Sequence, residues 1–195
     1  MKSLPIDAAD SLLDVNLPDP IMQASDLLVE IEAISVNPAD AKRRIRTAAE
    51  QDHSEPFTLG YDAVGIVCDL GAEFSGFSKG DRVWYAGDVN RPGSHAALQA
   101  VDHRIAALAP SSVSLQAAVS LPLVSLTAWE MLFDLLQVPT NETPSSLLVV
   151  GGVGSITLQL ACKLTGLHLI ATASRLETAE WCRKWVPIRR LNTTI

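Results

Sequence analysis

Cysteine is scarce in this sequence, and none of it stands at a spacing that binds metal. The 195-residue chain has three cysteines, Cys68, Cys162 and Cys182, which lie far apart and form no Cys-x-x-Cys pair. A structural zinc site needs closely grouped Cys or His ligands, so this pattern argues against one. The apolar segments around Cys68 and Cys162 indicate buried, reduced thiols of a cytoplasmic protein.

Positive charge is also in short supply. The chain has 15 Lys and Arg against 22 Asp and Glu, a formal net charge of −7. This balance argues against nucleic acid and anionic membrane surfaces as main partners. The one basic cluster, residues 42–46 ("KRRIR"), is interpreted as a solvated helix face, with a phosphate contact as the alternative.

A long hydrophobic run without breakers is missing. Residues 105–129 carry no charge but contain Pro110, Pro122 and five serines. Two helix breakers and that polarity favour a loop and short buried helices over a membrane span. Residues 1–14 also lack the apolar core of a secretory signal. We therefore expect no membrane partner and a cytoplasmic location.

Short strands dominate what is present in the first half. Branched or alternating segments at residues 26–36, 62–71, 81–87 and 94–102 are separated by glycine-rich turns. That spacing is typical of a β-barrel or sandwich. Residues 37–51 predict a helix, with Asn37 as its cap and Pro38 in its first turn.

The second half changes to helical periodicity. Helical spacing at residues 114–120 and 123–138 is broken by Pro122, and a polar linker covers residues 138–146. Then follow a strand at 147–150, a glycine turn, a helix at 155–164, a strand at 167–174 and a helix from residue 177. This order predicts a β-α-β unit with two parallel strands.

Two features of that unit suggest a dinucleotide. Gly151, Gly152 and Gly154 precede a helix whose free N–H groups suit a pyrophosphate, although a tight strand–helix connection has the same pattern. Ser174 and Arg175 end the second strand, where NAD-binding units carry an acid. A guanidinium there favours the 2′-phosphate of NADP, and the alternative is that Ser174 caps an exposed helix.

The motifs "NPADAK", "GYDAVGIV", "GDRVWYAG", "LPLVSLTAWE" and "ATASR" together resemble the medium-chain dehydrogenase/reductases, especially the quinone oxidoreductase-like (zinc-type alcohol dehydrogenase-like) branch. The resemblance covers nearly all of residues 4–184. It implies an α/β protein: a GroES-like β-barrel catalytic domain over residues 1–118, then an incomplete Rossmann domain, a doubly wound parallel sheet, over residues 119–195. Members transfer hydride from NAD(P)H to quinones, enones or other activated carbonyl compounds.

The resemblance also implies site residues. Asn37 and Thr127 would lie near the nicotinamide ribose, and Lys42 and Tyr61 near the substrate cleft. Their structural alternatives stay open: Asn37 as a helix cap, Lys42 as surface charge and Tyr61 as barrel packing. Zinc-using relatives carry a cysteine and later a "GHE", where this chain has Asn37-Pro38 and Gly60-Tyr61-Asp62. We therefore expect no metal, and hydrogen-bond donors must polarise the carbonyl.

The sequence departs from the family at two places. The family pattern "GGAGGVGS" is shortened here to residues 151–155, "GGVGS", and residues 185–195, "WVPIRRLNTTI", show no family match. The resemblance therefore implies a chain truncated after two of about six Rossmann strands. We expect impaired NADP(H) binding, because the shortened turn draws the helix N-terminus away from the phosphates.

The function predicted from the sequence is an NADPH-dependent reductase acting on a small-molecule quinone, enone or other carbonyl compound. The chain is also a possible homo-oligomer. Two alternatives remain at this point. One is a non-catalytic truncated product whose barrel binds a partner, and the other is a trans-acting enoyl reductase of a biosynthetic pathway.

Overall fold

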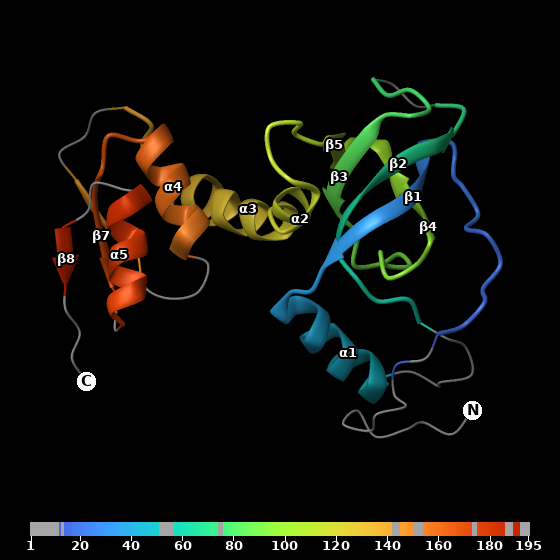
Figure 1. The fold of residues 1–195 in the computed structure, drawn as a ribbon, viewed down its shortest axis with the longest axis horizontal. Helices are drawn as coiled ribbons and strands as arrows, with labels where there is room; N and C mark the ends of the chain where they lie inside the picture. The colour runs from blue at the N-terminus through green and yellow to red at the C-terminus, as the bar shows by residue number, and fades with distance from the viewer. Residues whose placement is uncertain are drawn as a thin grey trace. The chain divides into compact units, whose positions relative to one another are not determined.

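The computed structural model describes residues 12, 14–50, 57–73, 76–141, 145–149, 154–172, 175–185 and 189–191. The chain forms two compact units, Met1–Leu123 and Val124–Ile195, coloured from blue to yellow-green and from yellow to red in Figure 1. The sequence interpretation put the domain boundary after residue 118, slightly earlier than the division between these units. Each unit is described by itself below.

The first unit is built on a five-stranded sheet of order β4-β1-β2-β3-β5, in which every pair is antiparallel. Its strands are β1 (Asp26–Ser35), β2 (Asp62–Leu70), β3 (Arg82–Ala86), β4 (Leu98–Asp102) and β5 (Ala106–Leu108). The first four were predicted from their alternation. The three-residue β5 was not, because it is too short to show a period.

The core of this unit lies along β1, β2 and β3. Its buried members are apolar side chains with at most 3% exposure: Leu27, Val29, Ala63, Val67, Val83, Tyr85 and Val101. On the other side of β2, Val64 packs with Ala118 and Val119 of helix α2 (Leu115–Val119). Because β2 is covered on both faces, its first residues are held firmly in place.

Cys68 does not lie in this core, so its predicted burial is wrong. The side chain is exposed, and its thiol donates to the Leu28 carbonyl oxygen at 3.2 Å. The physical reason is alternation: Val67 faces the core, and the next side chain points to the opposite face, where the cluster of Val64, Ala118 and Val119 does not include residue 68. Cys182 is buried as a free thiol and Cys162 is half-buried.

The helices begin where the sequence predicts. Helix α1 (Pro38–Glu50) starts directly after Asn37 and projects from the end of β1 (Figure 1). The break at Pro122 is confirmed, since α2 ends at Val119 and α3 (Pro122–Trp129) begins with the proline in its first turn. The chain then continues as the π-helical segment η3 (Glu130–Leu135).

The second unit has a parallel sheet of order β6-β7-β8. Its elements are β6 (Ser146–Val149), α4 (Gly154–Leu164), β7 (His168–Thr172), α5 (Leu176–Trp185) and β8 (Arg189–Leu191). The predicted β-α-β unit is confirmed. The sequence predicts two parallel strands, whereas the sheet has three. The third strand, β8, pairs Ile170 with Arg189 through backbone bonds, which a polar "RRL" segment does not reveal.

A small core holds this sheet to its helices. Leu158 and Ala161 of α4 pack with Leu169 and Ala171 of β7, and all four are at most 4% exposed. The chain therefore has the α/β architecture that the sequence implies, an antiparallel sheet in the first unit followed by a parallel β-α-β arrangement in the second. Within the described ranges, no helix is both long and apolar enough to cross a membrane.

Candidate functional site

Asp62, the first residue of β2, is fully buried and accepts hydrogen bonds on both carboxylate oxygens. Oδ2 accepts from Asn37 Nδ2 at 2.7 Å and from the Ser35 hydroxyl at 3.1 Å. Oδ1 accepts from the backbone N–H of Leu123 at 2.8 Å. Leu123 lies in the first turn of α3, where N–H groups have no partner within the helix. One buried carboxylate thus joins the end of β1, the start of α1 and the start of α3.

The electrostatics of Asp62 are a balance of opposing effects. Burial raises the pKa of this carboxyl, while the hydrogen bonds from Asn37, Leu123 and Ser35 lower it, and the nearby Asp40 raises it again. The net direction is upward, because burial outweighs the donors. Asp62 therefore keeps its proton to a higher pH than an exposed aspartate does.

Asn37 is 8% exposed and stands at the cap position of α1. Its backbone N–H donates to Asp40 Oδ2 at 2.7 Å, which is the return half of a capping box. Its side-chain amide donates to Asp62 instead of serving the helix. The cap interpretation is therefore right about the position of Asn37, but the side chain is directed to β2.

Tyr61 is half-buried and lines a shallow surface hollow of the barrel domain. Ligand pockets enclose roughly 300–1,000 Å³, and this shallow hollow encloses far less, so it does not form a ligand pocket by itself. Arg43 reaches it from α1 and lies 4.8 Å from the centre of the Phe57 ring. The remaining lining residues are Thr58, Leu59, Gly60, Asp88, Val89, Arg91 and Gly93.

The other predicted site residues lie on separate elements. Lys42 is exposed on α1, as surface charge would be, and Thr127 is exposed on α3. Gly154 is the first residue of α4, where an added Cβ would meet the Val149 side chain at 3.3 Å. Arg175 is exposed directly before α5. Gly151, Gly152 and Ser174 lie outside the described residues.

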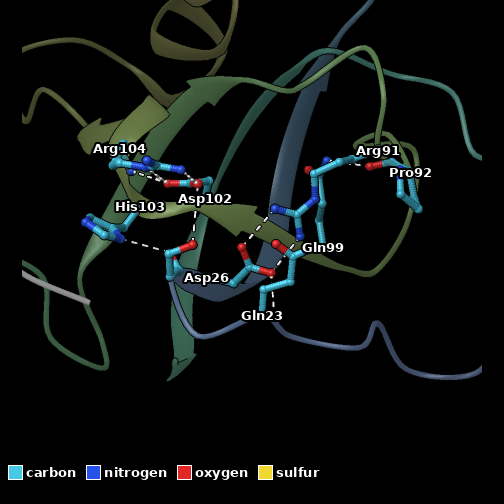
Figure 2. A network of polar contacts seen from close by, with 9 residues as sticks. Gln23, Asp26, Arg91, Pro92, Gln99, Asp102, His103 and Arg104 are labelled. Atoms are coloured by element: carbon cyan, nitrogen blue, oxygen red, sulfur yellow. Dashed lines mark hydrogen bonds and ion pairs between the residues drawn. The ribbon is translucent and has the colours of Figure 1, made fainter. Parts of the chain in front are cut away.

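One contact that the sequence does not predict is the ion pair between Asp26 and Arg91, a lining residue of the hollow (Figure 2). Arg91 donates to both carboxylate oxygens of Asp26, which is fully buried at the start of β1. Burial alone would raise the pKa of Asp26, but the hydrogen bonds from Arg91 and the Gln23 backbone outweigh it, and this pKa is lowered. No local motif marks this pair, because its partners are 65 residues apart.

A second set of bonds fixes the same loop. Gln99 Nε2 donates to the Pro92 carbonyl oxygen at 2.9 Å, and Gln99 Oε1 accepts from the Tyr85 hydroxyl at 2.9 Å. Figure 2 shows Gln99 and Pro92 beside the Arg91–Asp26 pair. These contacts connect the loop of residues 88–93 with the barrel core.

The residues at the zinc-ligand positions of zinc-using relatives do not fit a zinc ion. Zinc is bound by thiolates, imidazoles and carboxylates, whereas Asn37 offers an amide and its N–H already faces Asp62. Both oxygens of Asp62 are occupied by donors. In the part of the chain that the structure describes, no three His, Cys, Asp or Glu side chains gather around a common point.

Known proteins resemble this chain in sequence and in structure. Residues 23–109 match the alcohol dehydrogenase GroES-like domain. A zinc-type alcohol dehydrogenase-like protein of Staphylococcus aureus (strain COL) is 45% identical over 171 residues, which is 85% of this chain and 50% of that protein. The 2-methylene-furan-3-one reductase of Solanum lycopersicum is 33% identical over 173 residues, 83% of this chain and 43% of that protein.

A solved structure agrees with these sequence relatives. The Escherichia coli quinone oxidoreductase complexed with NADPH has a TM-score of 0.70 at 28% identity, and the match covers 92% of this chain and 53% of that one. The chain spans about half the length of the curated relatives it matches.

Proposed function

Because this chain belongs to the medium-chain dehydrogenase/reductase superfamily, we propose that it carries part of the site of an NADPH-dependent reductase of quinones or α,β-unsaturated carbonyl compounds. The observation that carries the proposal is the Asn37–Asp62 cluster beside Tyr61. The cluster consists of hydrogen-bonding groups. The sequence resemblance implies that zinc-using relatives carry metal ligands at these positions. The similarity to a 2-methylene-furan-3-one reductase and to a quinone oxidoreductase complexed with NADPH supports the substrate class and the cofactor.

The proposed chemistry divides between the cofactor and the chain. When bound, NADPH supplies the hydride. Tyr61 and Lys42 would donate hydrogen bonds to the carbonyl oxygen of the substrate, and Asn37 would accept one from the nicotinamide ribose. Thr127 is the other residue that the resemblance implies for the ribose. Donors aimed at the oxygen on which negative charge develops replace a metal as the polarising group.

The cofactor would be held by the start of the Rossmann unit. The free N–H groups at the start of α4, next to Gly151, Gly152 and Gly154, suit a pyrophosphate. Arg175 and Ser174 suit the 2′-phosphate of NADP(H). One charge-assisted contact contributes about 1.5–3 kcal/mol, which corresponds to roughly a ten- to hundredfold preference over NAD(H). We propose no zinc.

The experiment measures NADPH oxidation at 340 nm with 1,4-benzoquinone and with an enone. It compares the chain with a variant carrying Ala-Gly-Gly after Gly152, which restores the family length of the glycine turn. We expect tighter NADPH binding by calorimetry and faster oxidation in the inserted variant, and a loss of NADPH preference in Arg175→Ala. An inserted variant that binds NADPH but reduces neither substrate would favour the non-catalytic alternative.

The remaining sequence predictions stay proposals. A trans-acting enoyl reductase would be favoured if carrier-bound enoyl thioesters, and not free quinones, were reduced. The cytoplasmic location and the homo-oligomer likewise await measurement in cells and in solution.

A further inference from the structure

We propose that Asp62 is a positioning residue, which fixes the amide of Asn37 so that its Oδ1 atom is presented as an acceptor to a hydroxyl or N–H group of a bound ligand. The identity of that ligand rests on the proposed function, where a nicotinamide nucleoside offers both a ribose hydroxyl and a carboxamide N–H. The role of Asp62 rests on the geometry of the cluster alone.

The orientation of the amide follows from what a carboxylate can do. An ionised carboxylate only accepts hydrogen bonds, so the amide group that lies 2.7 Å from Asp62 Oδ2 must be the NH2 group of Asn37. The same nitrogen lies 3.5 Å from the Ser35 hydroxyl. The backbone N–H of Asn37 is taken by Asp40 at 2.7 Å. Two buried carboxylates thus engage the donors of Asn37 on both its main chain and its side chain.

One polar atom of the Asn37 side chain is left over. Among the described residues no donor bonds to Asn37 Oδ1, and this oxygen is not among the buried polar atoms that lack a partner. The residue as a whole is 8% exposed. A side chain whose donors are satisfied inside the fold, and whose oxygen has no donor among the described residues, is suited to receive a hydrogen bond from a ligand.

Asp62 is itself fixed by further hydrogen bonds, so its carboxylate cannot turn together with the Asn37 amide. Its Oδ1 is occupied by the Leu123 N–H, and its backbone carbonyl oxygen accepts from the Ser94 hydroxyl at 3.0 Å. Turning the carboxylate would break the bond to α3, in a residue with no exposed surface. Residues that contact a ligand need such a supporting shell to keep their geometry.

The start of α1 is capped by other groups, although the side chain of Asn37 bonds to Asp62. An asparagine at the cap position normally directs its side-chain oxygen to the N–H groups of the first turn. Here the Asp40 N–H donates to the Asn37 backbone oxygen at 3.0 Å, and Asp40 returns the bond through its own carboxylate. The side chain of Asn37 is thereby free to bond with Asp62.

The test uses two variants and the wild-type chain. Asp62→Asn has a single side-chain oxygen, so it cannot offer one oxygen to Asn37 and another to Leu123. The double variant Asn37→Asp with Asp62→Asn reverses the pair. The new amide at position 62 would donate to the new carboxylate at position 37, whose second oxygen would take the place of Oδ1. Ser35→Ala is the matched control, because it removes a donor to Asp62 but leaves the contact between Asn37 and Asp62.

The first readout is hydrogen exchange of the Asn37 side-chain amide by NMR. Asn90 is the internal reference, because its amide donates to the exposed Asp88 at 3.1 Å. We expect the wild-type Asn37 amide to exchange at least about tenfold more slowly than that of Asn90, and this difference to disappear in Asp62→Asn but not in Ser35→Ala. Similar rates for Asn37 and Asn90 in the wild type would overturn the proposal, even if Asp62→Asn did not fold.

The second readout is the binding of nicotinamide riboside, measured from the NMR chemical shifts of residue 37 during a titration. We expect affinity to fall about tenfold in Asp62→Asn and to recover to within about threefold in the double variant. Unchanged affinity in Asp62→Asn would overturn the role of Asp62. A wild-type chain that binds no riboside would instead overturn the ligand taken from the proposed function, while the exchange rates still decide whether Asp62 positions Asn37.

Discussion

Arg91 holds Asp26 with both terminal nitrogens of its guanidinium, Nη1 at 2.8 Å from Oδ1 and Nη2 at 2.6 Å from Oδ2. The Asp26 side chain has no exposed surface and that of Arg91 is 20% exposed. The pair joins the start of β1 to the loop that lines the Tyr61 hollow (Figure 2). It therefore matters both for the stability of the barrel and for the shape of the candidate site.

Replacing Arg91 by methionine leaves the Asp26 carboxylate buried without its partner. We expect the free energy of unfolding of the barrel domain to fall by about 3 kcal/mol, because breaking one side of a buried ion pair is costly. Urea unfolding followed by tryptophan fluorescence measures this. Arg104→Met is the control, since Arg104 is 74% exposed beside Asp102 and its loss should cost much less. Equal losses in the two variants would contradict the prediction.

The same pair should make stability depend on acid pH. The pKa of Asp26 is lowered in the folded state, so its contribution is present above its unfolded pKa of about 3.9 and is lost as pH falls through the lower folded value. We expect the urea midpoint to fall between about pH 5 and pH 2. The fall should be smaller in Asp26→Asn. An identical pH profile in that variant would contradict the prediction that Asp26 causes the loss of stability at acid pH.

Asp62 should have the opposite effect. Its folded pKa is raised, so its contribution is full below the unfolded value and decreases as pH rises through the folded one. The decrease lies on the higher-pH side of the window in which Asp26 acts. The difference between the midpoints of the wild type and Asp62→Asn, measured from about pH 3 to about pH 8, should therefore change with pH. A constant difference would indicate that the Asp62 pKa is not raised.

The sequence predicts those parts of this chain that have a period or a local signal. Alternation and glycine turns predict β1 to β4, and the proline at residue 122 predicts the start of α3. Strands β5 and β8 have three residues each, too few to alternate. The sequence also singles out Asn37 and Tyr61. It does not predict what Asp62 binds, because Asn37, Ser35 and Leu123 are 25, 27 and 61 residues away from it along the chain.

Replacing Gly60 by alanine tests whether the hollow depends on close packing of the backbone. Its φ is +109°, and an added Cβ would meet the Ser94 hydroxyl and lie 2.8 Å from the backbone nitrogen of His95. Gly80 has a similar φ of +94° with open space around it. We expect Gly80→Ala to cost about 1 kcal/mol from the backbone conformation alone, and Gly60→Ala about 3 kcal/mol or more. Equal thermal shifts in the two variants would show that the contacts of Gly60 relax freely.

Metal content is a direct test of the cluster around Asp62. We expect no stoichiometric zinc in the purified chain after dialysis, because the oxygens of Asp62 are taken by the Asn37 amide and the Leu123 N–H. Elemental analysis measures this. About one zinc per chain, lost on chelation together with any activity, would contradict both the sequence prediction and the geometry.

The second unit should promote self-association. Leu126, Trp129, Leu135 and Leu136 are between 48% and 78% exposed, and in the described sheet β6 pairs on one edge only. Exposed apolar side chains and open strand edges both favour association. We expect light scattering after gel filtration to detect oligomers, and Leu135→Glu with Leu136→Gln to reduce them. A monomeric wild type at micromolar concentration would contradict this.

The register of β1 has a consequence for how the barrel is made during translation. β1 pairs with β2 on one side, and with β4 on the other, where Asp26 lies opposite Asp102. Nothing can complete the second edge of β1 until the ribosome has released residue 102. β1 therefore waits for β4 before both of its edges are paired, and contacts of such long sequence separation form slowly. A ribosome paused before β4 emerges would expose an unfinished sheet edge to chaperones.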